Sequence, residues 1–197
     1  MIRQITLLVV IASLGACVSF LPEPEAPNAL YRLGPVEQVS NLELDRSVVI
    51  RQPDAARVLS GVEIAARDSS GAVLIVNGVE WADRAPRLLQ LHMLDLLSGD
   101  GEGVAVLPES GAKADYQLSW HLTEFSLSGR TATAKAEFLL IDTKTREALA
   151  QDTASVDIVA DGGSNSARAE AMAEAGRRIV EAGARFLANE LDVDTQI

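Results

Sequence analysis

The chain has 197 residues, and its 28 acidic side chains outnumber its 17 basic ones, which gives a formal charge of −11 at pH 7. Hydrophobic residues make up 48% of the sequence and aromatic residues 4%, so we expect one globular domain with a core of Val, Leu, Ile and Ala. Nucleic-acid binding needs a basic face, and broad binding to anionic lipid headgroups needs positive charge. The composition therefore argues against a nucleic-acid partner.

The N-terminus carries the pattern of an export signal. Arg3 and the α-amino group are followed by a mostly apolar run over 5–14, which ends in Leu14-Gly15-Ala16-Cys17. A membrane span needs about twenty apolar residues, so this run is too short to be one. The last four residues resemble a bacterial lipobox, in which the cysteine thiol receives a diacylglycerol. We predict a lipoprotein signal peptide at 1–16 and a lipidated Cys17; the alternative is an ordinary signal peptide with an incidental cysteine.

Cys17 is the single cysteine of the chain, so no disulfide can form within it. A thioether-linked cysteine has no free thiol, which suits an oxidising envelope compartment. Val18 stands at the second mature position instead of Asp, which resembles the sorting pattern of outer-membrane lipoproteins. Residues 17–28 contain three prolines and predict an extended tether. We expect the lipid to anchor the protein to the outer membrane, with the domain facing the periplasm.

The remaining residues, 29–197, predict one α+β domain with a mostly antiparallel sheet and two main helices packed on one face. Alternation of apolar and polar residues predicts strands over 42–50 and 62–66. A third strand at 73–76 is expected to end in a turn at Asn77-Gly78.

The second half of the chain has the clearest strand signals. Residues 116–127 alternate with a change of phase that predicts a bulge near Glu124, and 132–140 and 148–158 continue the alternation as hairpins. Small residues in the last strand leave room for a helix to approach the sheet closely. The final helix is expected over 167–191.

The first helix is predicted to begin in the segment Trp81 to Pro86, with Asp83 as its N-cap, and to run to Leu97. Trp81 is expected to fill the corner between sheet and helix. Leucines cover more than one stripe of this helix, so its second face needs a cover. The alternatives are a loop or the second helix of the same chain, or another subunit. We select Leu91 and Leu94 as candidate interface residues, which is compatible with a homo-oligomer.

The sequence offers little for catalysis. His92 and His121 each lack a second ligand at metal-binding spacing, and we interpret both as structural. Serine-nucleophile and zinc-protease motifs are absent from the sequence. The glycines of 98–103 follow a helix and stand among acids, which indicates a turn, since a phosphate-binding loop precedes a helix. We expect no enzyme activity, no cofactor and no metal site.

Several segments together resemble a known family. They are Tyr31-Arg32-Leu33-Gly34-Pro35, the run from Val79 to Gln90 with its Trp-Ala-x-x-x-Pro helix start, and Ala114-Asp115-Tyr116-Gln117-Leu118 through Phe125. With the lipobox, they are similar to the ABC-type transport auxiliary lipoprotein (PqiC-like) family. The resemblance implies a periplasmic lipoprotein partner of an Mce-domain protein and an ABC permease and ATPase, in systems that move phospholipid or other hydrophobic molecules between two membranes. Because this sequence has no P-loop motif, the ATPase is expected in another chain.

The leading hypothesis is therefore a non-catalytic accessory subunit of an Mce/ABC lipid-transport system. The alternative is a structural assembly lipoprotein, such as a pilotin, that does not contact cargo. An envelope enzyme is the third and most remote hypothesis.

Overall fold

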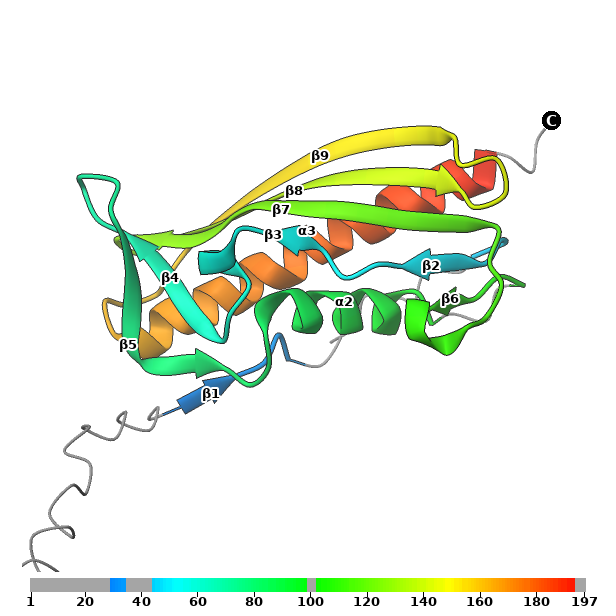
Figure 1. Ribbon diagram of the computed structural model, residues 1–197. Helices are drawn as coiled ribbons and strands as arrows, with labels where there is room; N and C mark the ends of the chain where they lie inside the picture. The colour runs from blue at the N-terminus through cyan, green and yellow to red at the C-terminus, as the bar shows by residue number, and fades with distance from the viewer. Residues whose placement is uncertain (1–28, 35–43, 99–101, 194–197) are drawn as a thin grey trace, which may run out of the picture.

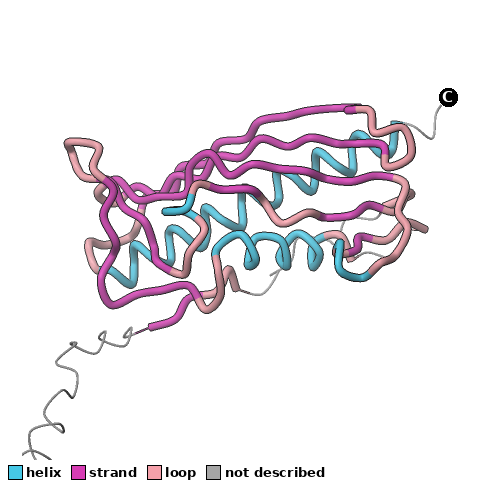
Figure 2. The backbone as a smooth tube through the Cα atoms, viewed as in Figure 1, coloured by secondary structure: helices cyan, strands magenta, loops and turns pink. Residues whose placement is uncertain are grey.

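The computed structural model describes residues 29–34, 44–98 and 102–193, in which a curved sheet lies along one long helix (Figures 1 and 2). The described strands are β1 (Ala29–Tyr31), β2 (Val48–Ile50), β3 (Asp54–Ala55), β4 (Glu63–Arg67), β5 (Val73–Trp81), β6 (Ala105–Val106), β7 (Tyr116–Ser128), β8 (Thr131–Asp142) and β9 (Ala148–Val159). The described helices are the 3₁₀ turns η1 (Arg57–Leu59) and η2 (Pro108–Ser110) and the α-helices α2 (Ala85–Leu96) and α3 (Asn165–Val193).

Strand β7 organises the sheet. On one side it pairs antiparallel with β8, which pairs antiparallel with β9. On its other side β2, β3 and β4 follow one another along β7, all parallel to it. β4 then pairs antiparallel with β5, β5 parallel with β1, and β2 parallel with β6.

The predicted α+β fold with a mostly antiparallel sheet is confirmed, and the sheet is mixed, because short parallel pairings join its long antiparallel ladders. The long ladders of β7, β8 and β9 come from adjacent hairpins, which alternation and turn residues reveal. The parallel contacts join segments far apart in the sequence, such as Val48 with Tyr116 and Ala66 with Leu127. Local patterns carry no signal for such pairings, because parallel neighbours need long crossover connections.

The β4–β5 hairpin corrects one predicted turn. β5 runs through Asn77-Gly78 to Trp81, and the turn lies instead at Asp68–Ala72, where Asp68 N donates to Ala72 O at 3.0 Å. Gly78 has φ of +76° and lies within β5 where the register with β4 shifts. The dipeptide thus forms a bulge, which also makes use of the left-handed backbone that glycine tolerates. The bulge predicted near Glu124 is confirmed by a register shift between Leu122 and Glu124.

Helix α3 packs against β8 and β9, and α2 packs alongside α3 (Figure 1). The sheet beneath α3 is lined by small residues, since Ala132, Ala134 and Ala136 are fully buried. On the helix, a Cβ built at Gly183 would lie 2.5 Å from Cε1 of Phe138. The helix and the sheet therefore approach so closely that glycine is needed at this contact.

Candidate functional site

The predicted lipidation residue, Cys17, lies outside the described residues, as do the signal peptide at 1–16 and the tether at 17–28. Within the described ranges, no helix combines the length and the apolar character that a membrane span requires. Cys17 therefore remains a prediction from the sequence.

Trp81 is the last residue of β5 and is 2% exposed. Its indole stacks on the ring of Phe125 from β7, with centroids 5.6 Å apart and an angle of 16° between the planes. Its backbone N–H donates to Val62 O at 2.7 Å, and the next amide, of Ala82, donates to Tyr31 O at 2.7 Å. Trp81 therefore holds the junction of β1, β5 and the start of α2, the corner position that the sequence predicted for it.

Helix α2 begins one residue later than the predicted N-cap, Asp83, implies. Ala85 is its first residue and Arg84 its N-cap, while the Asp83 carboxylate accepts a hydrogen bond from the adjacent Arg84 amide at 2.7 Å. The Ala85 amide donates to Gly61 O, and Pro86 occupies the first turn, where helical amides lack partners within the helix. At the start of α2, the Gly61 carbonyl therefore accepts one free amide hydrogen, and Pro86 has none to donate. An acidic cap was expected to satisfy such amides.

The surplus leucines of α2 are divided between two environments. Leu89, Met93 and Leu96 are fully buried, while Gln90 reaches through the core to donate to Ile50 O at 2.8 Å. Helix α3 of the same chain packs on α2. It therefore covers much of the second apolar face of α2, for which the sequence analysis considered several covers. On the outward side Leu91 is 36% exposed, whereas Leu94 is half-buried and packs against the core. Of the two candidate interface residues, Leu91 is the accessible one.

A hollow of about 610 Å³ adjoins this outward side of α2. Leu88 and Leu91 contribute apolar walls, Asp95 and Arg32 contribute opposite charges, and Gly34 lies at its rim. An amphipathic recess of this size is suited to a side chain or a short segment of a protein partner.

His92 faces inward from α2 and is 5% exposed. Burial lowers the pKa of His92 below its ordinary value, the carboxylates of Asp95 and Glu181 raise it, and the positive charge of Arg177 lowers it. The imidazole is therefore a buried group near charged side chains of both α2 and α3.

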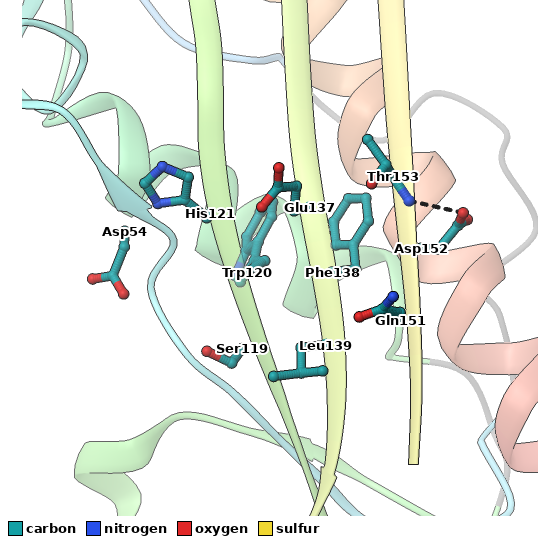
Figure 3. Close-up of a pocket in the computed structure, with 10 residues that line it drawn as sticks. All are labelled: Asp54, Ser119, Trp120, His121, Glu137, Phe138, Leu139, Gln151, Asp152 and Thr153. Atoms are coloured by element: carbon teal, nitrogen blue, oxygen red, sulfur yellow. Dashed lines mark hydrogen bonds between the residues drawn. The ribbon is translucent and has the colours of Figure 1, made fainter. Parts of the chain in front are cut away.

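A second hollow, of about 710 Å³, lies on the face of the sheet opposite α3 (Figure 3). Its lining residues belong to β3, β7, β8 and β9, and Figure 3 shows His121 beside Asp54 and Glu137. The register places His121 opposite Glu137 and Glu137 opposite Thr153 of β9, so these three side chains form one row across the sheet. The row provides hydrogen-bond donors and acceptors on an open surface.

The residues around His121 determine which chemistry this row could support. His121 is exposed, and the residues that line the hollow with it include one serine, Ser119, two positions away on β7, and no cysteine. Among the described residues, no three His, Cys, Asp or Glu side chains converge on a point where a metal ion could bind. The sequence interpretation missed this hollow, because Asp54 reaches His121 only through the long-range parallel pairing of β3 with β7.

The sequence also missed a second feature, an exposed apolar stretch on β5. Val73, Leu74 and Ile75 are 43%, 51% and 47% exposed, more than Leu91. The sequence predicted a strand at 73–76 without assigning its environment, and this part of β5 projects at the end of the sheet (Figure 1).

Known proteins are similar to this chain over most of the domain. Residues 31–183 match the profile of a family described as ABC-type transport auxiliary lipoprotein component. A crystal structure of a protein from Xanthomonas campestris, of family DUF330, superposes with a TM-score of 0.70 at 18% identity, covering 87% of this chain and 99% of that one. A second crystal structure, of an uncharacterised protein, gives 0.62 at 15% identity, covering 82% of this chain and 99% of that one. No curated protein matches the sequence significantly.

Proposed function

Because the chain belongs to the family of ABC-type transport auxiliary lipoprotein components, we propose that it is a non-catalytic, lipid-anchored accessory subunit of an Mce/ABC transport system. Its cargo would be phospholipid or another hydrophobic solute. The observation that carries this proposal is the extent of the family match, which runs from the last residue of β1 through most of α3 and so includes every strand from β2 to β9. Transport energy would come from an ATPase in another chain.

The surfaces of the domain support a role in docking. An acyl chain is held in a mostly apolar, enclosed cavity. The hollow of about 710 Å³ instead presents Asp54, His121 and Glu137 on an open sheet face. Such a polar surface can bind a protein partner, and the Mce-domain protein and the ABC permease are the partners that we propose.

Anchorage is the second component of the proposal. Twelve residue steps separate Cys17 from Ala29, a span of about 40 Å when fully extended. A diacylated cysteine provides two or more chains, which anchor more stably than one. The tether would hold the domain close to the outer membrane, on its periplasmic side.

Cross-linking in intact envelopes, followed by affinity purification and mass spectrometry, tests the partners. We expect an Mce-domain protein and permease subunits to be recovered with the wild-type chain. Recovery of a β-barrel or secretin without them would favour the pilotin-like alternative.

The matched control is Cys17→Ala. This variant should lack acyl label, remain unprocessed or become soluble, and recover fewer partners. Unchanged membrane retention and gel mobility of Cys17→Ala would refute lipidation, whereas partner recovery tests the transport role separately.

A further inference from the structure

The open edge of β5 differs from other strand edges in the sheet. β4 pairs with β5 on one side, and β1 pairs on the other side only at 79–81. Among the described residues, no strand pairs with the second edge of β5 over 73–77. The three apolar side chains of Val73, Leu74 and Ile75 are about half exposed in this open stretch.

The backbone of this stretch is oriented for a further strand. Asp68 N donates to Ala72 O at 3.0 Å, so residues 68 and 72 form a hydrogen-bonded pair of the β4–β5 hairpin. In an antiparallel ladder hydrogen-bonded and non-hydrogen-bonded pairs alternate. Leu74, opposite Ala66, therefore directs its N–H and C=O toward β4, while Val73 and Ile75 direct theirs toward the open edge. The open stretch ends at Asn77, whose carbonyl accepts a hydrogen bond from Asn165 Nδ2 at 2.9 Å.

Strand β9 shows how a sheet edge is usually protected. It pairs with β8 on one side, and Asp152 and Asp157 interrupt its sequence. Charged residues on an edge strand oppose pairing with another chain. The sequence Val73-Leu74-Ile75-Val76-Asn77-Gly78 contains no charge and no proline. One edge is thus guarded against pairing, and the other is not.

Two other occupants of the β5 edge are disfavoured. Insertion into a bilayer would leave the N–H and C=O groups of Val73 and Ile75 unpaired in hydrocarbon, which costs several kcal/mol for each group. The chain's own tether has prolines at 22, 24 and 27, and a proline cannot donate a hydrogen bond to a neighbouring strand.

We propose that β5 pairs antiparallel with β5 of a second copy of this chain. A two-fold axis lies at Leu74, which faces Leu74 of the second copy, and Val73 of each copy exchanges hydrogen bonds with Ile75 of the other. The same apolar surface is contributed by both copies, as an isologous interface requires. All backbone groups that point toward the open edge at Val73 and Ile75 are then satisfied.

The proposed pairing is short and therefore weak in dilute solution. It rests on the proposed lipid anchor, because confinement of both copies to one membrane raises their effective concentration. We expect the dimer in membranes and its dissociation after extraction into dilute detergent.

Disulfide cross-linking tests the pairing in membranes that contain the full chain. Leu74→Cys places two thiols at a non-hydrogen-bonded pair, where Cβ atoms lie closest across an antiparallel ladder. Val159→Cys is the control, since Val159 is 63% exposed and lies at the end of β9, on the other side of the sheet. Under mild oxidation we expect at least ten-fold more dimer with Leu74→Cys than with Val159→Cys. Equal yields would overturn the pairing.

The wild-type chain separates this result from the lipid anchor. A disulfide dimer of the wild type would show a free thiol at Cys17 and would refute lipidation without bearing on β5. Leu74→Cys dimers in a chain that lacks acyl label would support the pairing and refute the anchor.

Charge exchange provides a second measurement. Leu74→Asp alone should abolish chemical cross-linking between copies, because two carboxylates would face each other, and co-expression with Leu74→Lys should restore mixed dimers. If Leu74→Asp instead reduced binding to phospholipid vesicles and left the dimer unchanged, the edge would contact lipid and the proposal would be wrong.

Discussion

The β7–β8 hairpin has one face packed against α3 and one face in solvent. The two faces differ in how strongly the size of their side chains is constrained. On the inner face Leu122 and Ala136 lie opposite each other and are fully buried. On the outer face His121 and Glu137 lie opposite each other and are exposed. The inner face fixes the distance between sheet and helix, because a packed core tolerates little change in volume. The outer face can vary with little effect on folding and is therefore free to recognise a partner.

The largest effect on stability is expected for a buried residue at the end of β5, Trp81. Trp81→Ala removes a buried indole and its stacking on Phe125, and should lower the free energy of unfolding by about 3–5 kcal/mol. Denaturant titration measures the change. Glu137→Ala, on the outer face, is the matched control and should change stability by less than about 0.5 kcal/mol. Similar values for the two variants would contradict the distinction between the faces.

Gly183→Val tests the close approach of α3. The new Cβ would meet Phe138 at 2.5 Å and the Met93 methyl at 2.9 Å, and Phe138 is 2% exposed and cannot move aside. Overpacking of this kind costs about 1–3 kcal/mol. Gly163→Val is the control, because its Cβ would meet no atom within 4 Å. Thermal unfolding should separate the two variants, and a stable Gly183→Val protein would show that the helix can shift.

The sequence predicted the features that depend on neighbouring residues. Alternation located β7, β8 and β9 and the bulge near Glu124, and the same reasoning placed Trp81 at a corner. It could not predict that β2, β3 and β4 share one edge of β7, because these pairings depend on long crossover connections.

The candidate surfaces were predicted less well than the fold. The polar hollow requires Asp54 to lie beside His121, and that contact is set by a parallel pairing. Leu74 is 51% exposed on a stretch of β5 that β1 does not reach, and a continuous apolar run does not show which neighbours a strand will have. Both features are products of the sheet order.

The burial of His92 is expected to make the stability of the domain depend on pH. Because burial lowers its pKa, the folded protein binds fewer protons than the unfolded chain below about pH 6.5. The contribution of neutral His92 is complete above that pH and is lost as the pH falls toward the folded pKa. Unfolding measured from pH 7 to 5 should show a shallower decline for His92→Leu, with a difference of at most about 1.4 kcal/mol per pH unit. Equal slopes would show that His92 can take up a proton in the folded state at no cost.

The smallest effect on stability is expected on the outward side of α2. Leu91 is 36% exposed, so Leu91→Glu should change the free energy of unfolding by less than about 0.5 kcal/mol. Leu94 is half-buried against the core, and Leu94→Glu should cost about 1–2 kcal/mol because a carboxylate would be partly desolvated. If this side of α2 docks a partner, Leu91→Glu should reduce partner recovery from cross-linked envelopes while the thermal transition stays unchanged. Unchanged recovery would remove Leu91 from the interface, and outright unfolding would show that it is buried in its own domain. Because stability and recovery are measured on the same variant, a loss of recovery alone can be assigned to the surface and not to the fold.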